Sequence, residues 1–221
     1  MTELHKFQTR KTPGLQSLNG DYVELTPIDW AEHGAELELS IFGDENAELW
    51  TYLPLGPFPD VNAAQGVMTY VANQRNWQTL TITPKNTGKP SGTASYMRLR
   101  PEYGSAEIGC VVFGRSLQKT PAATESIYLL ASHVFDDLGY RRFEWKCENA
   151  NEASKNAAIR FGFEFEGIFR HDMIVKGRNR DTAWFSMIDQ DWPSLKARFE
   201  TWLAPENFDA DGRQKSALSS F

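Results

Sequence analysis

The chain has 221 residues, a formal net charge of −6 and a 41% hydrophobic composition that includes seven tryptophans. The acidic balance argues against a general nucleic-acid binder, which usually carries a basic excess. No apolar run is long enough to span a membrane, and the first residues lack the apolar block of a secretory signal. We therefore expect a cytoplasmic protein without nucleic-acid or membrane partners.

One large domain is the expected organisation, because the length suits it and no linker divides the chain. We place this domain at residues 20–205. The polar, aperiodic residues 1–19 are predicted to form an N-terminal arm, and the polar stretch 206–221 is predicted to form a C-terminal tail.

The N-terminal half predicts two helices followed by a pair of strands. A short strand at 22–25 precedes a helix that ends near Ile41, and a second helix is expected over 60–76. Alternating residues at 77–83 then predict a strand. Residues 92–99 are its expected antiparallel partner, after a turn with proline and glycine.

The loop 49–59, between the two expected helices, is unusually aromatic. It contains three prolines, which exclude a regular helix, and it carries Trp50 and Tyr52. Two interpretations are open: the loop caps the core, or it forms a wall of a binding pocket.

The middle of the chain carries the clearest pattern. An apolar strand over 108–113 is followed by a short loop, and Thr120 and Pro121 then predict the start of an amphipathic helix that Gly139 ends. Because a second strand follows at 143–147, this segment predicts a crossover between two parallel strands.

The loop before this helix suits a phosphate group, because backbone N–H groups and the positive end of the helix dipole point into it. Pro121 has no N–H group, so the N–H groups that remain for a ligand are those of Gln118, Lys119, Thr120, Ala122 and Ala123. Lys119 adds a positive charge. An ordinary helix cap with nothing bound is the alternative interpretation.

The remaining residues predict a helix, a hairpin and a final helix. Asn151 is the expected N-cap of a helix that runs to Phe161, and a long hairpin with Trp184 on its second arm follows. Asp191 precedes the last helix. Meandering antiparallel strands, one parallel crossover and flanking helices together predict a mixed α/β fold.

The sequence lacks the residue patterns of several other kinds of site. The four histidines are scattered and show no metal-ligand spacing, so we expect no metal site. No Gly-x-Ser-x-Gly elbow supports a serine hydrolase, and the loop before Thr120 lacks the Gly-Lys-Ser/Thr ending of a nucleotide-hydrolysing loop. Cys110 and Cys147 are expected to be reduced, buried thiols.

Four short motifs occur in a specific order: Glu107-Ile108-Gly109, Gln118 to Ala123, Asn151-x-x-Ser154 and Phe161-Gly162-Phe163. The second resembles motif A of the GNAT superfamily of N-acetyltransferases, Gln/Arg-x-x-Gly-x-Gly/Ala, except that Pro121 replaces the usual glycine. The ordered set resembles the ribosomal-protein N-terminal acetyltransferase (RimJ/RimL-like) branch. The resemblance covers residues 20–190 and is sharpest from 106 to 170.

This resemblance implies a GNAT-type fold, with a mostly antiparallel central sheet and a parallel crossover that splays apart to hold acetyl-CoA as co-substrate. It assigns coenzyme binding to the strand, the loop and the two helix starts around the crossover. The residues are Val111, Val112, Phe113, Gln118, Lys119, Thr120, Pro121, Ala122, Ala123, Thr124, Asn151 and Ser154.

The same resemblance implies Glu107 as general base and Ser154 as a proton donor to the leaving thiolate. Two plainer interpretations stay open: Glu107 pairs with a neighbouring cation, and Asn151 is only a helix cap. In this family the region between the first two helices often shapes the acceptor pocket. Trp50, Tyr52 and Trp184 are the candidate pocket aromatics, and a place in the core is the alternative for each of them.

We therefore expect an acetyl-CoA-dependent N-acetyltransferase that moves an acetyl group to a primary amine by direct transfer in a ternary complex. The expected acceptor is a protein N-terminus or a small amine. Two alternatives remain: a non-catalytic acyl-CoA-binding module, and a self-associating interaction domain. The sequence leaves both a monomer and a homodimer open.

Overall fold

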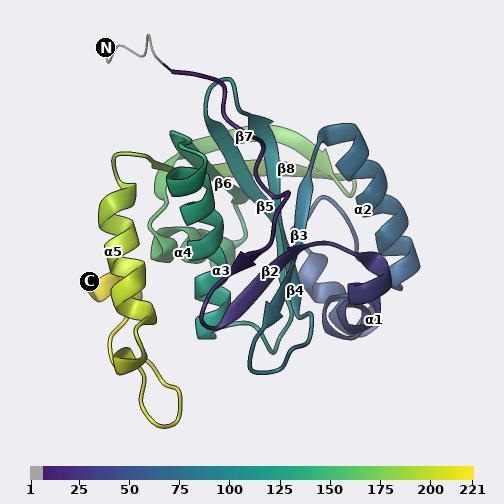
Figure 1. Cartoon of the computed structure of the whole chain (residues 1–221). Coiled ribbons are helices and arrows are strands. Elements are labelled where there is room, and N and C mark those ends of the chain that lie inside the picture. The colour runs from purple at the N-terminus through teal and green to yellow at the C-terminus, as the bar shows by residue number, and fades with distance from the viewer. Residues whose placement is uncertain (1–6) are drawn as a thin grey trace.

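The structure is a computed structural model and describes residues 7–221 (Figure 1). Its centre is a mixed sheet with the strand order β1-β2-β3-β4-β5-β6-β8-β7. The strands are β1 (Leu18–Asn19), β2 (Val23–Pro27), β3 (Gln78–Pro84), β4 (Gly92–Arg100), β5 (Ser105–Phe113), β6 (Arg142–Glu148), β7 (Glu164–Val175) and β8 (Arg178–Ile188). Neighbours are antiparallel except β5 and β6, which are parallel. The predicted mixed α/β fold with one parallel crossover is therefore confirmed.

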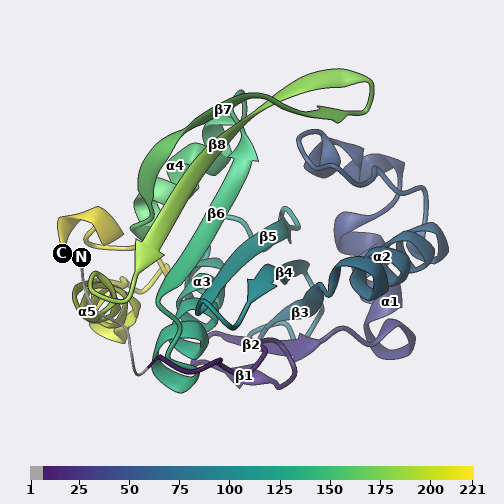
Figure 2. The same cartoon turned by 90° about the horizontal axis from the view of Figure 1, so that it is seen from above.

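Helices cover both faces of this sheet (Figure 2). They are α1 (Trp30–Ile41), α2 (Val61–Arg75), α3 (Pro121–Ser132), α4 (Glu152–Phe161) and α5 (Trp192–Leu203). Apolar residues of α3, α4 and α5 form the larger core cluster with Ile108 and Phe143 of the sheet. A second cluster joins α1, α2 and the 3-10 segment Asp44–Trp50 to Trp77 and Val112. No helix in the described part of the chain is long and apolar enough to cross a membrane.

The starts of α1, α3 and α4 have side-chain caps, whereas Asp191 makes no side-chain cap for α5. Asp29, Thr120 and Asn151 each accept a hydrogen bond from a backbone N–H group in the first turn of α1, α3 and α4. The helix after Pro121 becomes a π-helical turn from His133 before Gly139 ends it. The pairing of β1 with β2 was not predicted, because a strand of two residues carries no alternation.

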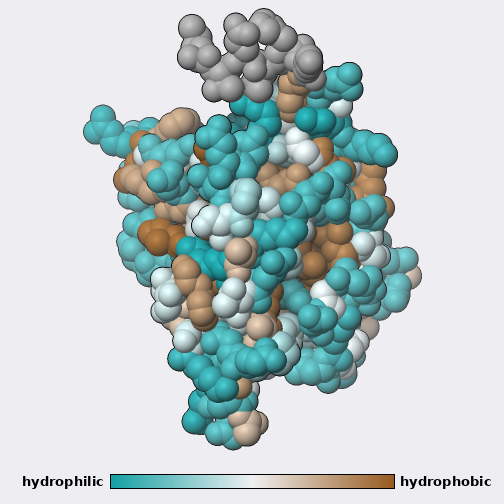
Figure 3. Space-filling model, turned by 60° about the vertical axis from the view of Figure 1, so that its left-hand side comes forward, coloured by the Kyte–Doolittle hydropathy of each residue, from teal (hydrophilic) through white to brown (hydrophobic). Residues whose placement is uncertain are grey.

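The C-terminal residues pack against the body of the protein. Phe208 meets Trp202 of α5 edge to face with ring centroids 5.2 Å apart, and Leu218 is fully buried. Figure 3 brings the α5 side forward and shows apolar patches separated by hydrophilic side chains. Residues 1–6 of the predicted arm lie outside the described residues. The division into arm, domain and tail stays a prediction.

A β-bulge in β5 changes which face its side chains occupy. Ala106 and Ile108 join the core beneath α3, whereas Val112, although in step with them, packs with α1 and α2. Cys110 lies between them with a left-handed φ of 47°, where the register against β4 shifts. Pairing of β5 with β6 stops at Ile108 opposite Trp145. Beyond that pair the two parallel strands separate, and we call the gap between them the seam.

The β7–β8 hairpin reaches over towards the segment between α1 and α2 (Figure 2). At its turn, Lys176 Nζ donates a 2.7 Å hydrogen bond to the backbone carbonyl oxygen of Trp50. The tip of the hairpin is therefore tied to the aromatic loop at the far end of the fold.

Glu125 connects α3 to the start of the sheet. Its buried carboxylate accepts hydrogen bonds from the backbone N–H groups of Asp21, Tyr22 and Val23, at 2.7, 2.6 and 2.8 Å. A carboxylate that accepts hydrogen bonds from three backbone donors fixes the start of β2 against α3.

We predict that Glu125→Ala lowers the free energy of unfolding by about 3 kcal/mol or more, because it leaves backbone donors without an acceptor in a buried place. Urea unfolding followed by circular dichroism measures the change. Glu164→Ala, which removes an exposed carboxylate, is the control and should stay within about 0.5 kcal/mol of the wild type. Equal effects of the two substitutions would contradict this anchoring role.

Candidate active site

A cavity of about 1150 Å³ occupies the seam and extends from it in two directions. One end reaches the loop before α3 and the first turn of α4. The other end lies between loop 49–59 and the β7–β8 hairpin. Because one cavity connects both ends, a ligand held by the loop and a ligand held under the hairpin can meet at the seam.

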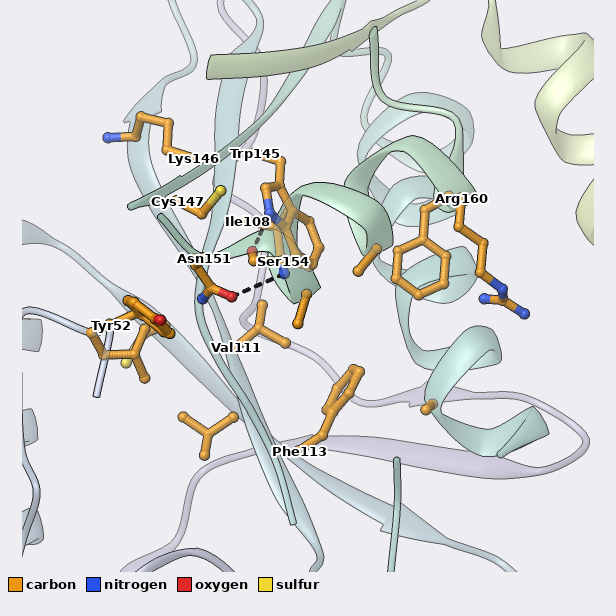
Figure 4. A pocket seen from close by; sticks show the side chains of 18 of the residues that line it. Tyr52, Ile108, Val111, Phe113, Trp145, Lys146, Cys147, Asn151, Ser154 and Arg160 are labelled. Atoms are coloured by element: carbon orange, nitrogen blue, oxygen red, sulfur yellow. Dashed lines mark hydrogen bonds between the residues drawn. The ribbon is translucent and has the colours of Figure 1, made fainter. Parts of the chain in front are cut away.

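The walls of the seam come from three elements (Figure 4). Val111 and Phe113 lie on β5, Trp145 and Cys147 on β6, and Asn151 begins α4. Val112, which was also predicted to contact the coenzyme, lines the cavity as well. Past Ile108 the edge of β5 that faces β6 has no paired strand, so its backbone groups are available to a ligand inside the seam.

The loop before α3 presents free backbone N–H groups, as predicted, but fewer of them. Gln118 N–H donates to the carbonyl of Gly114, and Ala123 N–H donates to Thr120 Oγ1, the N-cap oxygen. Within the described residues, the N–H groups of Lys119, Thr120 and Ala122 have no protein acceptor. Lys119 adopts a left-handed φ of 61°, which turns the chain sharply before the helix.

Proline is compatible with this loop, because Pro121 occupies the first position of α3. At that position a helix has no intrahelical acceptor for an N–H group, so proline costs little there. Pro121, Ala123 and Thr124 line the cavity together with Gln118, Lys119 and Thr120. Among the predicted loop residues, Ala122 is buried and does not line it.

Ser154 is held at the seam by two contacts, both drawn in Figure 4. Its backbone N–H donates to Asn151 Oδ1 at 3.1 Å, which is the cap of α4, and its Oγ accepts a 3.0 Å hydrogen bond from Trp145 Nε1. The indole uses a lone pair of the hydroxyl oxygen, so the hydroxyl proton remains free to be donated. Sequence reasoning found Ser154 but not Trp145, whose role depends on its place across the seam.

Glu107 lies at the inner end of the seam and is 3% exposed. Burial raises the pKa of the Glu107 carboxyl, while ion pairs with Lys146 Nζ at 2.8 Å and Arg98 Nε at 3.6 Å oppose that shift. The raised pKa brings the carboxylate closer to the strength that a general base needs near neutral pH.

A second buried carboxylate, Glu144, lies directly opposite Glu107 in the β5–β6 register. It accepts 2.6 and 2.7 Å hydrogen bonds from Arg100 Nη2 and Arg142 Nε, and Arg98 Nε lies 3.7 Å from it. The alternation of charged residues on β6 indicates that Glu144 and Lys146 lie on the same face of the strand. Their partner Glu107 follows only from the register.

The aromatic candidates divide between core and cavity. Trp50 is fully buried, stacks on Phe42 with centroids 5.7 Å apart, and donates its indole N–H to the carbonyl of Ile41 at 2.6 Å. It does not line the cavity, whereas Tyr52 and Trp184 do. The loop therefore fills both roles that were open, since Trp50 caps the second core cluster and Tyr52 faces the cavity.

Trp184 is placed between two cations. The guanidinium carbon of Arg98 lies 5.1 Å from the ring centroid, and Lys146 Nζ lies 4.8 Å from it. The ring thus holds both partners of Glu107 in position through cation–π contacts.

Cys110 and Cys147 are free, buried thiols that line the cavity. Burial raises the pKa of Cys110 to about 12 and also raises the pKa of Cys147, which the neighbouring Ser154 hydroxyl partly offsets. Both thiols are therefore protonated at neutral pH and poor nucleophiles. No group of three or more His, Cys, Asp or Glu residues in the described chain could hold a metal ion.

Comparison with known proteins places this cavity in a family. The acetyltransferase (GNAT) domain model matches residues 23–164. A GCN5-related N-acetyltransferase from Brucella melitensis is 41% identical, with a TM-score of 0.93 and 98% of each chain covered. The N-acetyltransferase p20 of Bacillus licheniformis, itself uncharacterized, is 28% identical over 148 residues, which are 66% of this chain and 83% of p20. The chain belongs to the GNAT acetyltransferase family.

A ribosomal-protein-S5-alanine acetyltransferase from Vibrio fischeri is also similar in structure, with a TM-score of 0.61, 80% of this chain and 98% of that chain covered, and 17% identity. At this identity the likeness shows a shared fold alone.

We predict that neither cysteine of the folded protein reacts with iodoacetamide at pH 8. Only the thiolate attacks, and Cys110, with a pKa of about 12, is ionised to roughly one part in ten thousand at that pH. Burial also raises the pKa of Cys147, which keeps its thiolate fraction small. Intact-mass spectrometry measures the labelling, with the urea-unfolded chain as the control that should take up label at both sites. Rapid labelling of the native protein would show that the seam leaves a thiol ionised.

Proposed function

We propose that this protein transfers the acetyl group of acetyl-CoA to a primary amine, directly and within a ternary complex. The observation that carries the proposal is the cavity itself, which joins free loop N–H groups, the unpaired edge of β5 and the buried Glu107 carboxylate. Bringing both reactants into one such space can supply roughly 7–11 kcal/mol of the barrier lowering.

The residues present fit acetyl-CoA. The N–H groups of Lys119 and Thr120, the positive end of α3 and the charge of Lys119 suit a diphosphate. After Ile108 the edge of β5 that faces β6 has no strand partner, so its backbone groups suit the amides of the pantetheine arm, although the carbonyl of Phe113 already accepts a hydrogen bond from Gln118 Nε2. The coenzyme supplies the activated thioester. Pro121 stands at the first position of α3, where a missing N–H group costs little, so the loop keeps the free N–H groups of Lys119 and Thr120.

Glu107 is the proposed general base. As the amine nitrogen forms its bond to the thioester carbonyl carbon, Glu107 accepts the amine's proton, directly or through one water. Lys146 and Arg98 stabilise its ionised form, while burial makes it a stronger base than an exposed glutamate. The interpretation of Glu107 as only an ion-pair partner is kept as the alternative that mutation tests.

Ser154 is the proposed proton donor. When the carbon–sulfur bond breaks, the sulfur carries the electron pair and gains from a proton. The hydroxyl of Ser154 is oriented by Trp145 Nε1 at 3.0 Å, which leaves its hydrogen free. Direct transfer is supported by the raised pKa values of Cys110 and Cys147, because protonated thiols do not take up the acetyl group.

The acceptor is a protein N-terminus or a small amine. The ordered motifs of the RimJ/RimL-like branch favour a protein N-terminus, and assignment to that branch stays a prediction. Cytoplasmic location also stays a prediction, and both a monomer and a homodimer stay open.

A non-catalytic acyl-CoA-binding module and a self-associating domain are the rivals. Thermal stabilisation by acetyl-CoA, absent in a purely self-associating domain, distinguishes the first two functions from the third. Incubation of a lysate and an amine library with labelled acetyl-CoA, followed by mass spectrometry, then identifies the acceptor. Binding of the coenzyme without transfer to any amine would favour the non-catalytic module.

We predict that Glu107→Gln lowers kcat/KM by about 10²- to 10⁴-fold while acetyl-CoA binding is retained. Because the ionised carboxylate is the active form, wild-type kcat/KM should fall as the pH drops through the Glu107 pKa, which burial raises. That acidic limb should disappear in the variant. The control Glu164→Gln changes an exposed glutamate and should keep both rate and profile. A variant with the wild-type rate and limb would remove Glu107 from the mechanism.

Ser154→Ala is expected to slow the chemical step by about 10²-fold or more, because the leaving sulfur loses its proton donor. Rapid-quench single turnovers measure this step apart from product release. Ser194→Ala, an exposed serine on α5, is the matched control. If single turnovers of Ser154→Ala match the wild type, the leaving sulfur is protonated by another group.

A further inference from the structure

Arg180 on β8 is a buried cation without a protein anion. Its residue is 8% exposed, and it lines the cavity. Among residues 7–221 the Arg180 side chain makes one hydrogen bond, which Nε donates to Thr182 Oγ1 at 3.3 Å. No carboxylate among these residues lies within ion-pair distance of the guanidinium. Burying an unpaired charge is costly, so the position calls for an anionic ligand.

The side chain faces the same side of the sheet as Glu107. Ala183 and Phe185 belong to the core with α3, so Arg180, Thr182 and Trp184 alternate to the opposite face. Lys146, which contacts Glu107, is directly opposite Trp184 in the β6–β8 register. The loop before α3 lies at the start of a helix that packs against the opposite face of the sheet, the face of Ala183 and Phe185.

The side chain of Arg180 extends along β8 towards the part of the cavity where Glu107 lies. Its Nε bonds to Thr182, so the side chain runs along β8 towards Trp184 rather than away from it. One step of two residues along a strand is about 7 Å. The guanidinium lies beside Thr182, which is one such step from Trp184, and Trp184 is opposite the Lys146 that contacts Glu107. The guanidinium is therefore on the order of 7–10 Å from the place where an amine would meet Glu107.

A second donor without an acceptor lies in the same wall. Trp184 Nε1 is buried and has no hydrogen-bond acceptor among the described residues. Arg98, over the ring of Trp184, approaches Glu107 and Glu144 only at 3.6 and 3.7 Å, longer than a hydrogen bond. Arg98 and Lys146 are compensated by the Glu107 and Glu144 carboxylates. The groups of this wall that lack a partner are therefore the Arg180 guanidinium and the Trp184 N–H, and both suit an acceptor that carries anionic oxygens.

We propose that Arg180 binds a carboxylate of the acceptor, and that the acceptor is an acidic peptide end. This inference rests on the proposed acetyl transfer. A single α-amino acid is too short, since its carboxylate lies next to its amine. A peptide whose second or third residue is Asp or Glu spans the required distance, because each extended residue covers about 3.3–3.6 Å. Arg180 then sets specificity and takes no part in the chemical step.

The test is peptide binding measured by calorimetry in the presence of coenzyme A. The probes are amidated tetrapeptides Ser-Ala-Glu-Ala and Ser-Glu-Ala-Ala, with Gln or Lys in place of Glu as matched comparisons. We expect the wild type to bind at least one Glu peptide about tenfold or more tighter than its Gln counterpart, the usual strength of a charge-assisted hydrogen bond. In Arg180→Met that preference should fall to within about twofold.

Two controls separate specificity from structure. Arg170→Met removes an exposed arginine of β7 that does not line the cavity, and it should keep the preference for Glu. The melting temperature of Arg180→Met should stay the same or rise, because the substitution removes an unpaired buried charge. Arg180→Gln, a polar substitution, provides the same comparison if the Met variant does not fold.

Three results would overturn the inference: equal wild-type affinity for Glu and Gln peptides, a preference that survives in both Arg180 variants, or weaker coenzyme A binding with unchanged peptide binding. The last would assign Arg180 to a phosphate of the coenzyme. Turnover is scored separately. Acetylation of all peptides without a preference for Glu contradicts only the role of Arg180, whereas failure to acetylate any amine overturns the proposed function.

Discussion

The separation of β5 from β6 is the constraint on which the rest of the site depends. Their parallel pairing ends at Ile108 and Trp145 because the bulge at Cys110 turns β5 away. An ordinary parallel sheet would use those backbone groups in its own hydrogen bonds. Here they border a cavity instead, and the first turns of α3 and α4 both open onto it. The backbone groups that can bind a ligand are thus the ones that would otherwise form hydrogen bonds between β5 and β6.

The paired strands below the seam set the electrostatics. Glu107 and Glu144 are directly opposite each other, a costly arrangement for like charges. Four cations from β4 and β6 compensate: Arg98, Arg100, Arg142 and Lys146. Arg98 approaches both carboxylates, so a change at one carboxylate is felt at the other. Removal of Glu144 would therefore alter the environment of Glu107 without changing the loop before α3.

Local sequence was sufficient for the helix starts and the crossover, because Thr120, Pro121 and Asn151 act within a few residues of themselves. It was insufficient where long-range packing decides. Cys110 is a non-glycine residue in a left-handed conformation, which no composition rule anticipates. The burial of Trp50 depends on Phe42 and Ile41, and the isolation of Arg180 depends on the absence of a carboxylate that only the folded chain reveals.

The contact between Lys176 and the Trp50 carbonyl has a consequence for access. It joins the tip of the hairpin to the segment between α1 and α2, which the hairpin reaches towards in Figure 2, and residues of both segments line one half of the cavity. A peptide acceptor of the kind proposed above would pass beneath this span of chain. The span would favour an extended chain end over the surface of a folded partner at this side of the cavity.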